Sequence, residues 1–233
     1  GVDIVIPDFT YVEKNRDKLR GVVLTHGHED HIGGLAYLLK KVNVPVYGTK
    51  LTLGLVEGKL KEHGLYGKAN LNVVSHRKTV RMGCMAVEFI RVNHSIPDAV
   101  GMAVHTPAGI IVHTGDFKID YSPINGEIID LTRFGELGSK GVLALMADST
   151  NAERPGYTQS ERKVGESFEK LFTKAEGKRI IIATFSSNIH RIQQIVNCAE
   201  KYGRKVAVFG RSMINVISTA IELGYLDVPK GII

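Results

Sequence analysis

The sequence contains no tryptophan and only two cysteines, Cys84 and Cys198. The two cysteines lack the paired spacing of a zinc knuckle or a disulfide framework, so we expect buried free thiols of the kind found in a reducing compartment. No apolar run is long enough to cross a bilayer, and no signal peptide is evident. These absences predict a cytoplasmic protein with no membrane partner.

The composition is that of an ordinary globular protein with a basic surface. The chain has 233 residues, of which 43% are hydrophobic and 23% charged, which is enough for a sizeable core. Its formal net charge is +6, and its isoelectric point is about 9.2. A basic balance favours anionic partners such as nucleic acid, although a merely basic surface explains the charge equally well.

Short apolar runs alternate with helical patterns along the first three-quarters of the chain. The pattern predicts strands at 21–25, 44–47 and 85–92, a hairpin of 102–105 with 110–113, and a strand at 141–147. It predicts helices at 31–42 and 51–63. Thr158 to Glu161 has the sequence of a capping box, which would open a helix that ends near residue 175.

The last quarter of the chain has a different, regular pattern. Strands are predicted at 179–185 and 205–209, and helices at 188–202 and 212–224. A β-α-β-α series of this kind predicts parallel strands joined by right-handed crossovers. We therefore expect residues 178–233 to belong to a second α/β domain, after a first domain of residues 1–177.

The run from Thr25 to His31 carries the strongest chemical signal. It holds three histidines and two acidic residues, and it lies between a predicted strand and a predicted helix, where α/β sheets place their sites. Histidine and carboxylate are ligands that divalent metals such as zinc accept. A solvated polar loop is the alternative, but unpaired buried imidazole and carboxylate groups are costly. The run therefore predicts a metal site.

Two further ligands are expected downstream, because the loop alone cannot complete a metal site. His94 follows the strand that ends near residue 92, and Asp116 follows the hairpin strand that ends at His113. Three strands of one sheet could deliver His26, His94 and Asp116 to one edge. Asp116 is the residue we expect to bridge two cations with its two carboxylate oxygens.

The motifs together resemble the metallo-β-lactamase superfamily and, within it, the ribonuclease J family of β-CASP nucleases. The resemblance rests on five segments that cover most of the chain, at 26–34, 93–98, 113–118, 147–151 and 183–191. It implies an α/β fold in which an incomplete αββα sandwich is followed by the start of a β-CASP domain. It also implies hydrolysis of RNA phosphodiester bonds by a metal-activated water, from the 5′ end and internally.

Roles for individual residues follow from the resemblance. It implies that His26, His28 and His94 hold a first metal, that Asp30 and His31 hold a second, and that Asp116 bridges the two. Asp30, Asp116 and Asp148 are the implied catalytic carboxylates, although Asp148 also suits a turn. The implied RNA-binding residues near the start of the helix at 188–202 are Ser186, Asn188, His190 and Arg191, for which a capped surface helix is the alternative.

The chain also departs from the family pattern, and this leaves other functions open. A last histidine ligand of the second metal and a histidine near the leaving group are not found, so we expect weak binding of the second ion and poor catalysis. The metals are expected to be zinc, with manganese as the alternative. A hydrolase of a small ester, thioester or phosphodiester and an inactive RNA-binding fragment are the competing functions. A homodimer or homotetramer of the full-length protein is also expected from the family.

Overall fold

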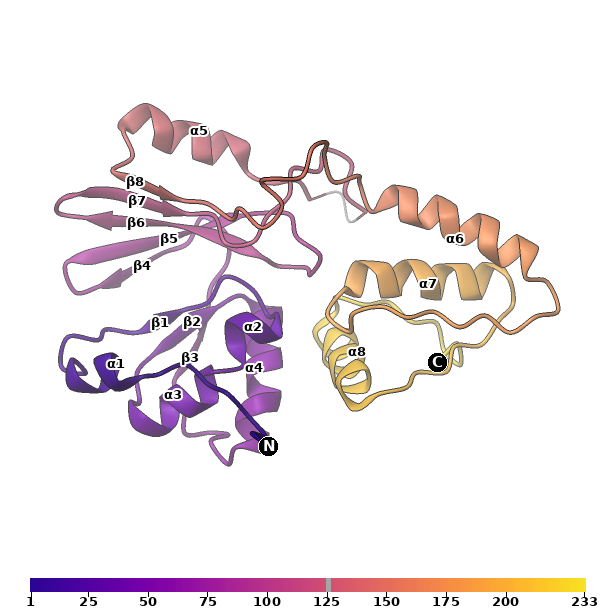
Figure 1. Cartoon of the computed structure of the whole chain (residues 1–233), viewed down its shortest axis with the longest axis horizontal. Coiled ribbons are helices and arrows are strands. Elements are labelled where there is room, and N and C mark those ends of the chain that lie inside the picture. Colours follow the sequence, from indigo (N-terminus) through magenta and orange to yellow (C-terminus); the bar gives the residue numbers. More distant parts are fainter. Residues whose placement is uncertain (125–126) are drawn as a thin grey trace.

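Two β-sheets lie face to face in the computed structural model, which describes residues 1–124 and 127–233. Helices cover the outer faces of both sheets, and three further helices form a second unit beside the sandwich (Figure 1). No helix in the described ranges is long and apolar enough to cross a membrane. The layers follow from the sequence pattern, because each sheet and helix has one apolar side that must be covered.

The smaller sheet is parallel and has strand order β1-β2-β3, with β1 at Val22–Val23, β2 at Val46–Gly48 and β3 at Leu71–Val73. It packs against helices α2 (Glu29–Ile32), α3 (Leu35–Lys41) and α4 (Lys50–Glu62) of the same stretch of chain. Helix α1 (Thr10–Lys14) precedes β1 and has no buried residue. The helix predicted at 31–42 is divided into α2 and α3 at Gly33 and Gly34, since Gly34 is the N-cap of α3. The division leaves α2 as a short helix that contains the end of the histidine run, including Asp30 and His31.

The larger sheet has order β4-β5-β6-β7-β8 and is antiparallel except where β7 and β8 pair in parallel. Its strands are β4 (Thr79–Met82), β5 (Met85–Arg91), β6 (Val100–Thr106), β7 (Gly109–His113) and β8 (Ala144–Met146). Helix α5 (Leu131–Lys140) covers its outer face with Leu137, which is fully buried. Cys84 is exposed at the β4–β5 turn, so the expectation of a buried thiol holds for Cys198 and is wrong for Cys84.

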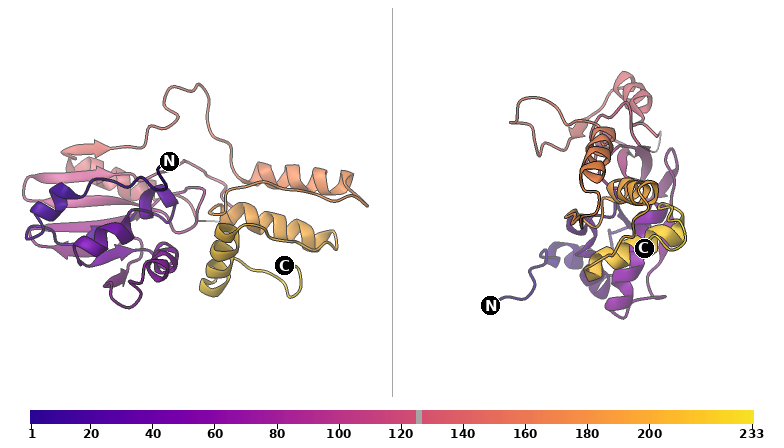
Figure 2. Two further views of the ribbon diagram at one scale, coloured as in Figure 1. Left: turned by 60° about the horizontal axis from the view of Figure 1, so that its bottom comes forward. Right: turned by 90° about the vertical axis from the view of Figure 1, so that its right-hand side faces the viewer.

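The second unit contains α6 (Arg162–Lys174), α7 (Ile189–Lys201) and α8 (Arg211–Leu223). Helices α6 and α7 lie side by side (Figure 2), and Phe168 and Phe172 of α6 pack on Cys198 and Ala199 of α7. The capping box predicted at 158–161 does not form. Glu161 is itself the N-cap residue of α6, and its carboxylate accepts hydrogen bonds from Arg191 instead of from the backbone.

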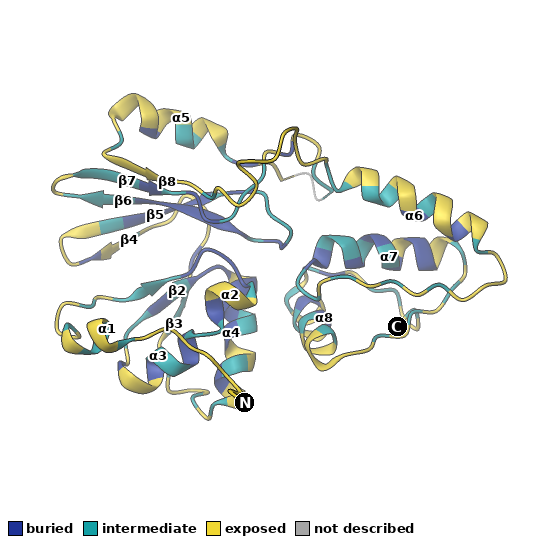
Figure 3. Cartoon of the chain, in the orientation of Figure 1, coloured by how far each residue is buried: buried dark blue, intermediate teal, exposed yellow. Residues whose placement is uncertain are grey.

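The two strands predicted in the second unit, at 179–185 and 205–209, are absent from the described ladders. Both segments line an apolar cavity of about 800 Å³ and do not pair with each other. Ile181, Phe185 and Phe209 are each more than 80% exposed, and Figure 3 shows the long exposed connection into α7. A strand needs a neighbour for its backbone hydrogen bonds, and no described strand lies beside either segment.

The second unit is joined to the sandwich by a shared apolar core. Leu51 of α4 and Ile96 pack in one cluster with Ile189 of α7 and Ile217 of α8. All four side chains are buried, and the two that belong to the sandwich, Leu51 and Ile96, are at most 1% exposed. The position of the second unit is therefore set by burial of apolar surface and not by a flexible linker.

Close packing of α4 on α8 predicts opposite effects for two glycines of α4. A Cβ at Gly54 would lie 2.5 Å from Leu223 Cδ1 and 3.2 Å from Thr219 Cγ2, whereas a Cβ at Gly58 would meet nothing within 4 Å. Gly58→Ala should raise the free energy of unfolding by about 0.5–1 kcal/mol, because alanine favours helix. Gly54→Ala should lower it by about 1–2 kcal/mol through overpacking. Urea denaturation measures both, and a stabilised Gly54→Ala would contradict this packing.

Candidate metal centre

The metal-ligating residues lie where strands end. Strands β5 and β7 are each antiparallel to β6, and β8 is parallel to β7, so the carboxyl ends of β5, β7 and β8 share one edge. His94, Asp116 and Asp148 follow these three strands. His26 follows β1, which belongs to the smaller sheet. The expectation that one sheet delivers all the ligands is therefore wrong, and the centre lies between the two sheets.

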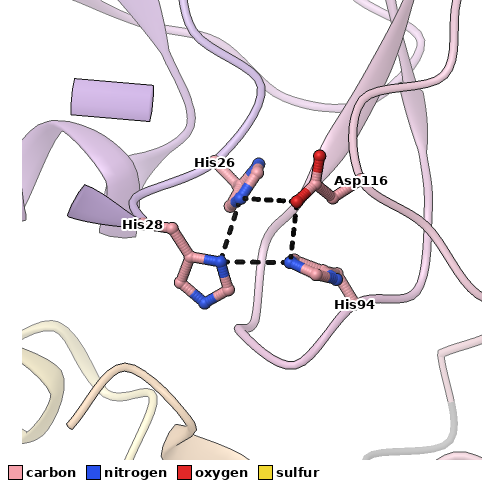
Figure 4. Close-up of side chains that lie close together, drawn as sticks. All are labelled: His26, His28, His94 and Asp116. Carbon is pink, nitrogen blue, oxygen red and sulfur yellow. Dashed lines mark hydrogen bonds and ion pairs between the residues drawn. The ribbon is translucent and has the colours of Figure 1, made fainter. Parts of the chain in front are cut away.

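Four side chains bring one ligand atom each to a common point. These atoms of His26, His28, His94 and Asp116 all lie within 4.8 Å of one another. Nδ1 of His28 is 3.1 Å from Nε2 of His26 and 3.1 Å from Nε2 of His94. Figure 4 shows the three rings and the carboxylate facing one another. Three imidazole nitrogens and one carboxylate oxygen fit a divalent metal such as zinc.

Neighbouring hydroxyl groups orient the histidine rings. Thr25 Oγ1 is 3.0 Å from Nδ1 of His26, which leaves Nε2 directed toward the cluster. Ser95 Oγ is 3.4 Å from Nε2 of His28, on the side of the ring away from the cluster. Hydrogen bonds at the second nitrogen of a ligating histidine fix its tautomer and ring orientation. Sequence reasoning missed both hydroxyls, because serine and threonine beside a histidine carry no distinctive signal.

Burial keeps the clustered histidines neutral. Desolvation, together with the neighbouring rings of His31, His94 and His28, lowers the pKa of His26 to about 2. Desolvation and the His28 ring, partly offset by the Asp116 carboxylate, lower the pKa of His94 to about 4. Neutral imidazole is the form that binds a metal, so the folded chain holds these rings ready for a cation at neutral pH.

Asp116 connects the first set of ligands with the second. Its Oδ2 lies 3.9 Å from Nε2 of His26, 3.6 Å from Nε2 of His94 and 3.5 Å from Nε2 of His31. His31 Nε2 is also 3.5 Å from Asp30 Oδ2. Asp30 and His31 both lie in the short helix α2, which directly follows His28. A single oxygen of Asp116 therefore lies near histidines of both expected ligand sets.

Asp148 lies beside the cluster and is held in a tight turn. Its Oδ1 accepts hydrogen bonds from the Thr150 hydroxyl at 2.6 Å and the Thr150 N–H at 2.9 Å. These bonds hold the pKa of Asp148 below its usual value, and the Phe117 N–H and the His94 ring lower it further. The contact with Phe117 adjoins Asp116. Asp148 therefore forms a turn and also lies close to the expected metal ligand His94.

The four predicted RNA-binding residues surround the start of α7 but do not join the metal cluster. Asn188 is the N-cap of α7, and its Oδ1 accepts from the Arg191 N–H at 3.1 Å. Arg191 Nη2 donates to both carboxylate oxygens of Glu161, at 3.0 and 3.1 Å. Ser186 Oγ is 2.9 Å from Ser212 Oγ. Burial lowers the pKa of His190, which keeps its ring neutral.

Family models match both parts of the chain. The model of the metallo-β-lactamase superfamily matches residues 4–180, and that of the ribonuclease J β-CASP domain matches residues 177–233. The mixed α/β fold, with a metallo-β-lactamase part followed by a β-CASP part, is thereby confirmed. A crystal structure of a protein of unknown function from Enterococcus faecalis V583 shares the fold, with a TM-score of 0.65 at 20% identity over 89% of this chain and 50% of that one.

Curated relatives match along the whole chain. Ribonuclease J from Synechocystis sp. is 51% identical over 234 residues, which cover 100% of this chain and 36% of the relative. Ribonuclease J 1 from Streptococcus pyogenes is 51% identical over 231 residues, which cover 99% of this chain and 41% of the relative. The chain thus spans well under half the length of these proteins. It belongs to the metallo-β-lactamase superfamily, and within that superfamily its relatives are ribonucleases J.

Proposed function

We propose that the chain is the metal-binding part of a ribonuclease J-like enzyme that hydrolyses RNA phosphodiester bonds. The observation that carries the proposal is the position of Asp116 Oδ2, which lies within 3.9 Å of His26, His94 and His31. A carboxylate that faces two groups of ligands favours a dinuclear centre. Bound divalent ions would supply Lewis acidity toward a phosphoryl group and an attacking water.

The residues of the chain would arrange this centre and its surroundings. His26, His28 and His94 would hold the first ion, Asp30 and His31 would hold the second, and Asp116 would serve both. The turn at Asp148 is tied to the segment that carries Asp116, because the Asp148 N–H donates to Thr114 Oγ1 at 3.0 Å. Zinc is the ion we infer, because buried neutral imidazole dominates the first set of ligands.

RNA is the substrate favoured by the relatives' name and by the charge of the chain. The net charge of +6 would attract a phosphate backbone and make binding sensitive to salt. Ser186, Asn188, His190 and Arg191 are proposed to face the RNA. Arg191 would have to exchange Glu161 for a phosphate, and Asn188 would contribute mainly by ordering the start of α7. Assembly of the full-length protein into dimers or tetramers stays a prediction.

Cleavage of a 5′-monophosphorylated RNA tests the proposal. We expect slow cleavage that needs added Zn²⁺ or Mn²⁺, stops with a chelator and falls more than about 100-fold in His94→Ala, because loss of a ligand costs more than loss of an outer partner. His63→Ala removes a histidine that lies outside the cluster and should leave the rate unchanged. Turnover of a lactam or thioester without RNA cleavage would favour the small-molecule hydrolase. RNA binding that needs neither metal nor His94 would favour a binding fragment.

A further inference from the structure

The loop that carries His94 is anchored at its far end by an unusual aspartate. The loop is closed by a hydrogen bond from the Val92 N–H to the Ala99 carbonyl at 3.2 Å. Inside it, Asp98 adopts a φ of +67°, in the left-handed region that few side chains other than those of Asn and Asp enter readily. The loop therefore has a metal ligand near one end and a residue in a demanding conformation at the other.

A single oxygen of Asp98 joins three parts of the molecule. Its Oδ2 accepts a hydrogen bond from the Leu51 N–H at 3.3 Å, in the first turn of α4, and one from the Tyr225 hydroxyl at 2.7 Å. Thr49, the N-cap of α4, forms no side-chain cap, so Asp98 provides a negative group at this helix start from a distant loop. Tyr225 comes from the second unit, directly after Gly224 ends α8.

Burial makes this contact a firm one. Tyr225 is half-buried, and desolvation together with the Asp98 carboxylate raises the pKa of its hydroxyl, so the phenol stays protonated and remains the donor. Between the two ends of the loop, Ile96 is 1% exposed and packs in the apolar core shared with α7 and α8. The loop thus has little freedom to move without also displacing residues of the second unit.

We propose that Tyr225 and Asp98 are positioning residues through which the second unit holds His94 in place for the first metal. This inference rests on the proposed metal centre and gives the second unit a role in metal binding that is separate from RNA contact. Without the Tyr225 bond, the loop can relax from its left-handed conformation, and Nε2 of His94 loses its fixed distance from His28. The rest of the ligand set stays intact.

Affinity for Zn²⁺, measured by competition with a chromophoric chelator, tests the proposal. Tyr225→Phe should weaken binding of the first ion about 10-fold, the lower end of the range for partners that orient ligands. Tyr202→Phe is the matched control, because Tyr202 also donates to a carboxylate, Glu169 Oε2 at 2.9 Å, in the second unit but far along α7. The control should leave Zn²⁺ affinity unchanged even if its melting temperature falls as much as that of Tyr225→Phe.

Two variants of Asp98 extend the test. Asp98→Asn keeps a carbonyl oxygen for both donors and tolerates the left-handed backbone, so it should bind Zn²⁺ nearly as well as the unaltered chain. Asp98→Ala removes the acceptor and should bind at least as weakly as Tyr225→Phe. Equal affinity in Tyr225→Phe and the unaltered chain would overturn the positioning role while leaving the metal centre standing. Failure of the unaltered chain to bind Zn²⁺ would overturn both.

Discussion

Asp116→Asn is expected to remove the second metal ion and to weaken the first by more than about 100-fold, beyond the effect of losing a partner that only orients a ligand. The reason is geometric, since one oxygen of Asp116 lies within 3.9 Å of His26, His94 and His31. An amide of the same shape keeps the packing but lacks the charge that a bridging ligand needs. Metal content per chain, measured after dialysis against Zn²⁺ or Mn²⁺, gives the result directly.

Asp120→Asn is the control for this change. Asp120 is buried four residues further along the same segment, where it contacts Lys118 and the Ser122 N–H but none of the clustered histidines. It should keep the metal content of the unaltered chain. If Asp116→Asn also retained two ions per chain, the Asp116 carboxylate would not be a bridge, and the bridged arrangement proposed here would be wrong.

Arg133→Met is expected to lower the free energy of unfolding by about 3–5 kcal/mol at neutral pH, the usual cost of removing one partner of a buried ion pair. Arg133 on α5 donates from Nε to Glu88 Oε1 at 2.6 Å and from Nη2 to Glu88 Oε2 at 2.9 Å. Glu88 is a strand residue with an exposed fraction of only 6%. Arg77→Met removes a similar two-point contact, with Asp130, at the surface, and should cost much less.

The same pair predicts how stability depends on pH. The hydrogen bonds from Arg133 hold the pKa of Glu88 below its usual value, and His105 acts in the same direction. A lowered pKa in the folded state means that the pair stabilises the fold above the usual glutamate pKa of about 4.3, and that this stabilisation is lost as the pH falls through the lowered value. The deficit of Arg133→Met in urea denaturation should therefore shrink in acid. If the difference in free energy of unfolding between Arg133→Met and the unaltered chain stayed constant down to about pH 3, the stabilising ion pair would be contradicted.

Sequence reasoning finds the side chains that gather in the cluster, because their signal is local. Three histidines and two acidic residues after a short apolar run have few other uses, and His94 and Asp116 each follow a strand. The division of the strands between two sheets could not be predicted from local patterns, because β1 and β5 are both short apolar runs although they belong to different sheets. Pairing depends on which strands meet in space, which also explains why the strands predicted at 179–185 and 205–209 do not form.

Residues that support the site from a distance were not predictable either. Asp98 and Tyr225 are 127 residues apart in sequence, and neither has a pattern that marks it as a partner of the other. At 158–161 the local pattern predicts a capping box that does not form, because Glu161 makes a contact with a distant residue instead. Glu161 binds Arg191, because an ion pair in a half-buried position satisfies two side chains at once.

The two extended segments that line the apolar cavity of the second unit, at 179–185 and 205–209, favour association between molecules. Ile181, Phe185 and Phe209 present apolar side chains beside backbone that forms no described ladder, which is the combination that templates strand addition between molecules. Association of chains through this surface would bury it and would grow with concentration. Metal titrations are therefore best carried out on dilute, freshly fractionated monomer, so that the ions counted per chain belong to the histidine cluster alone.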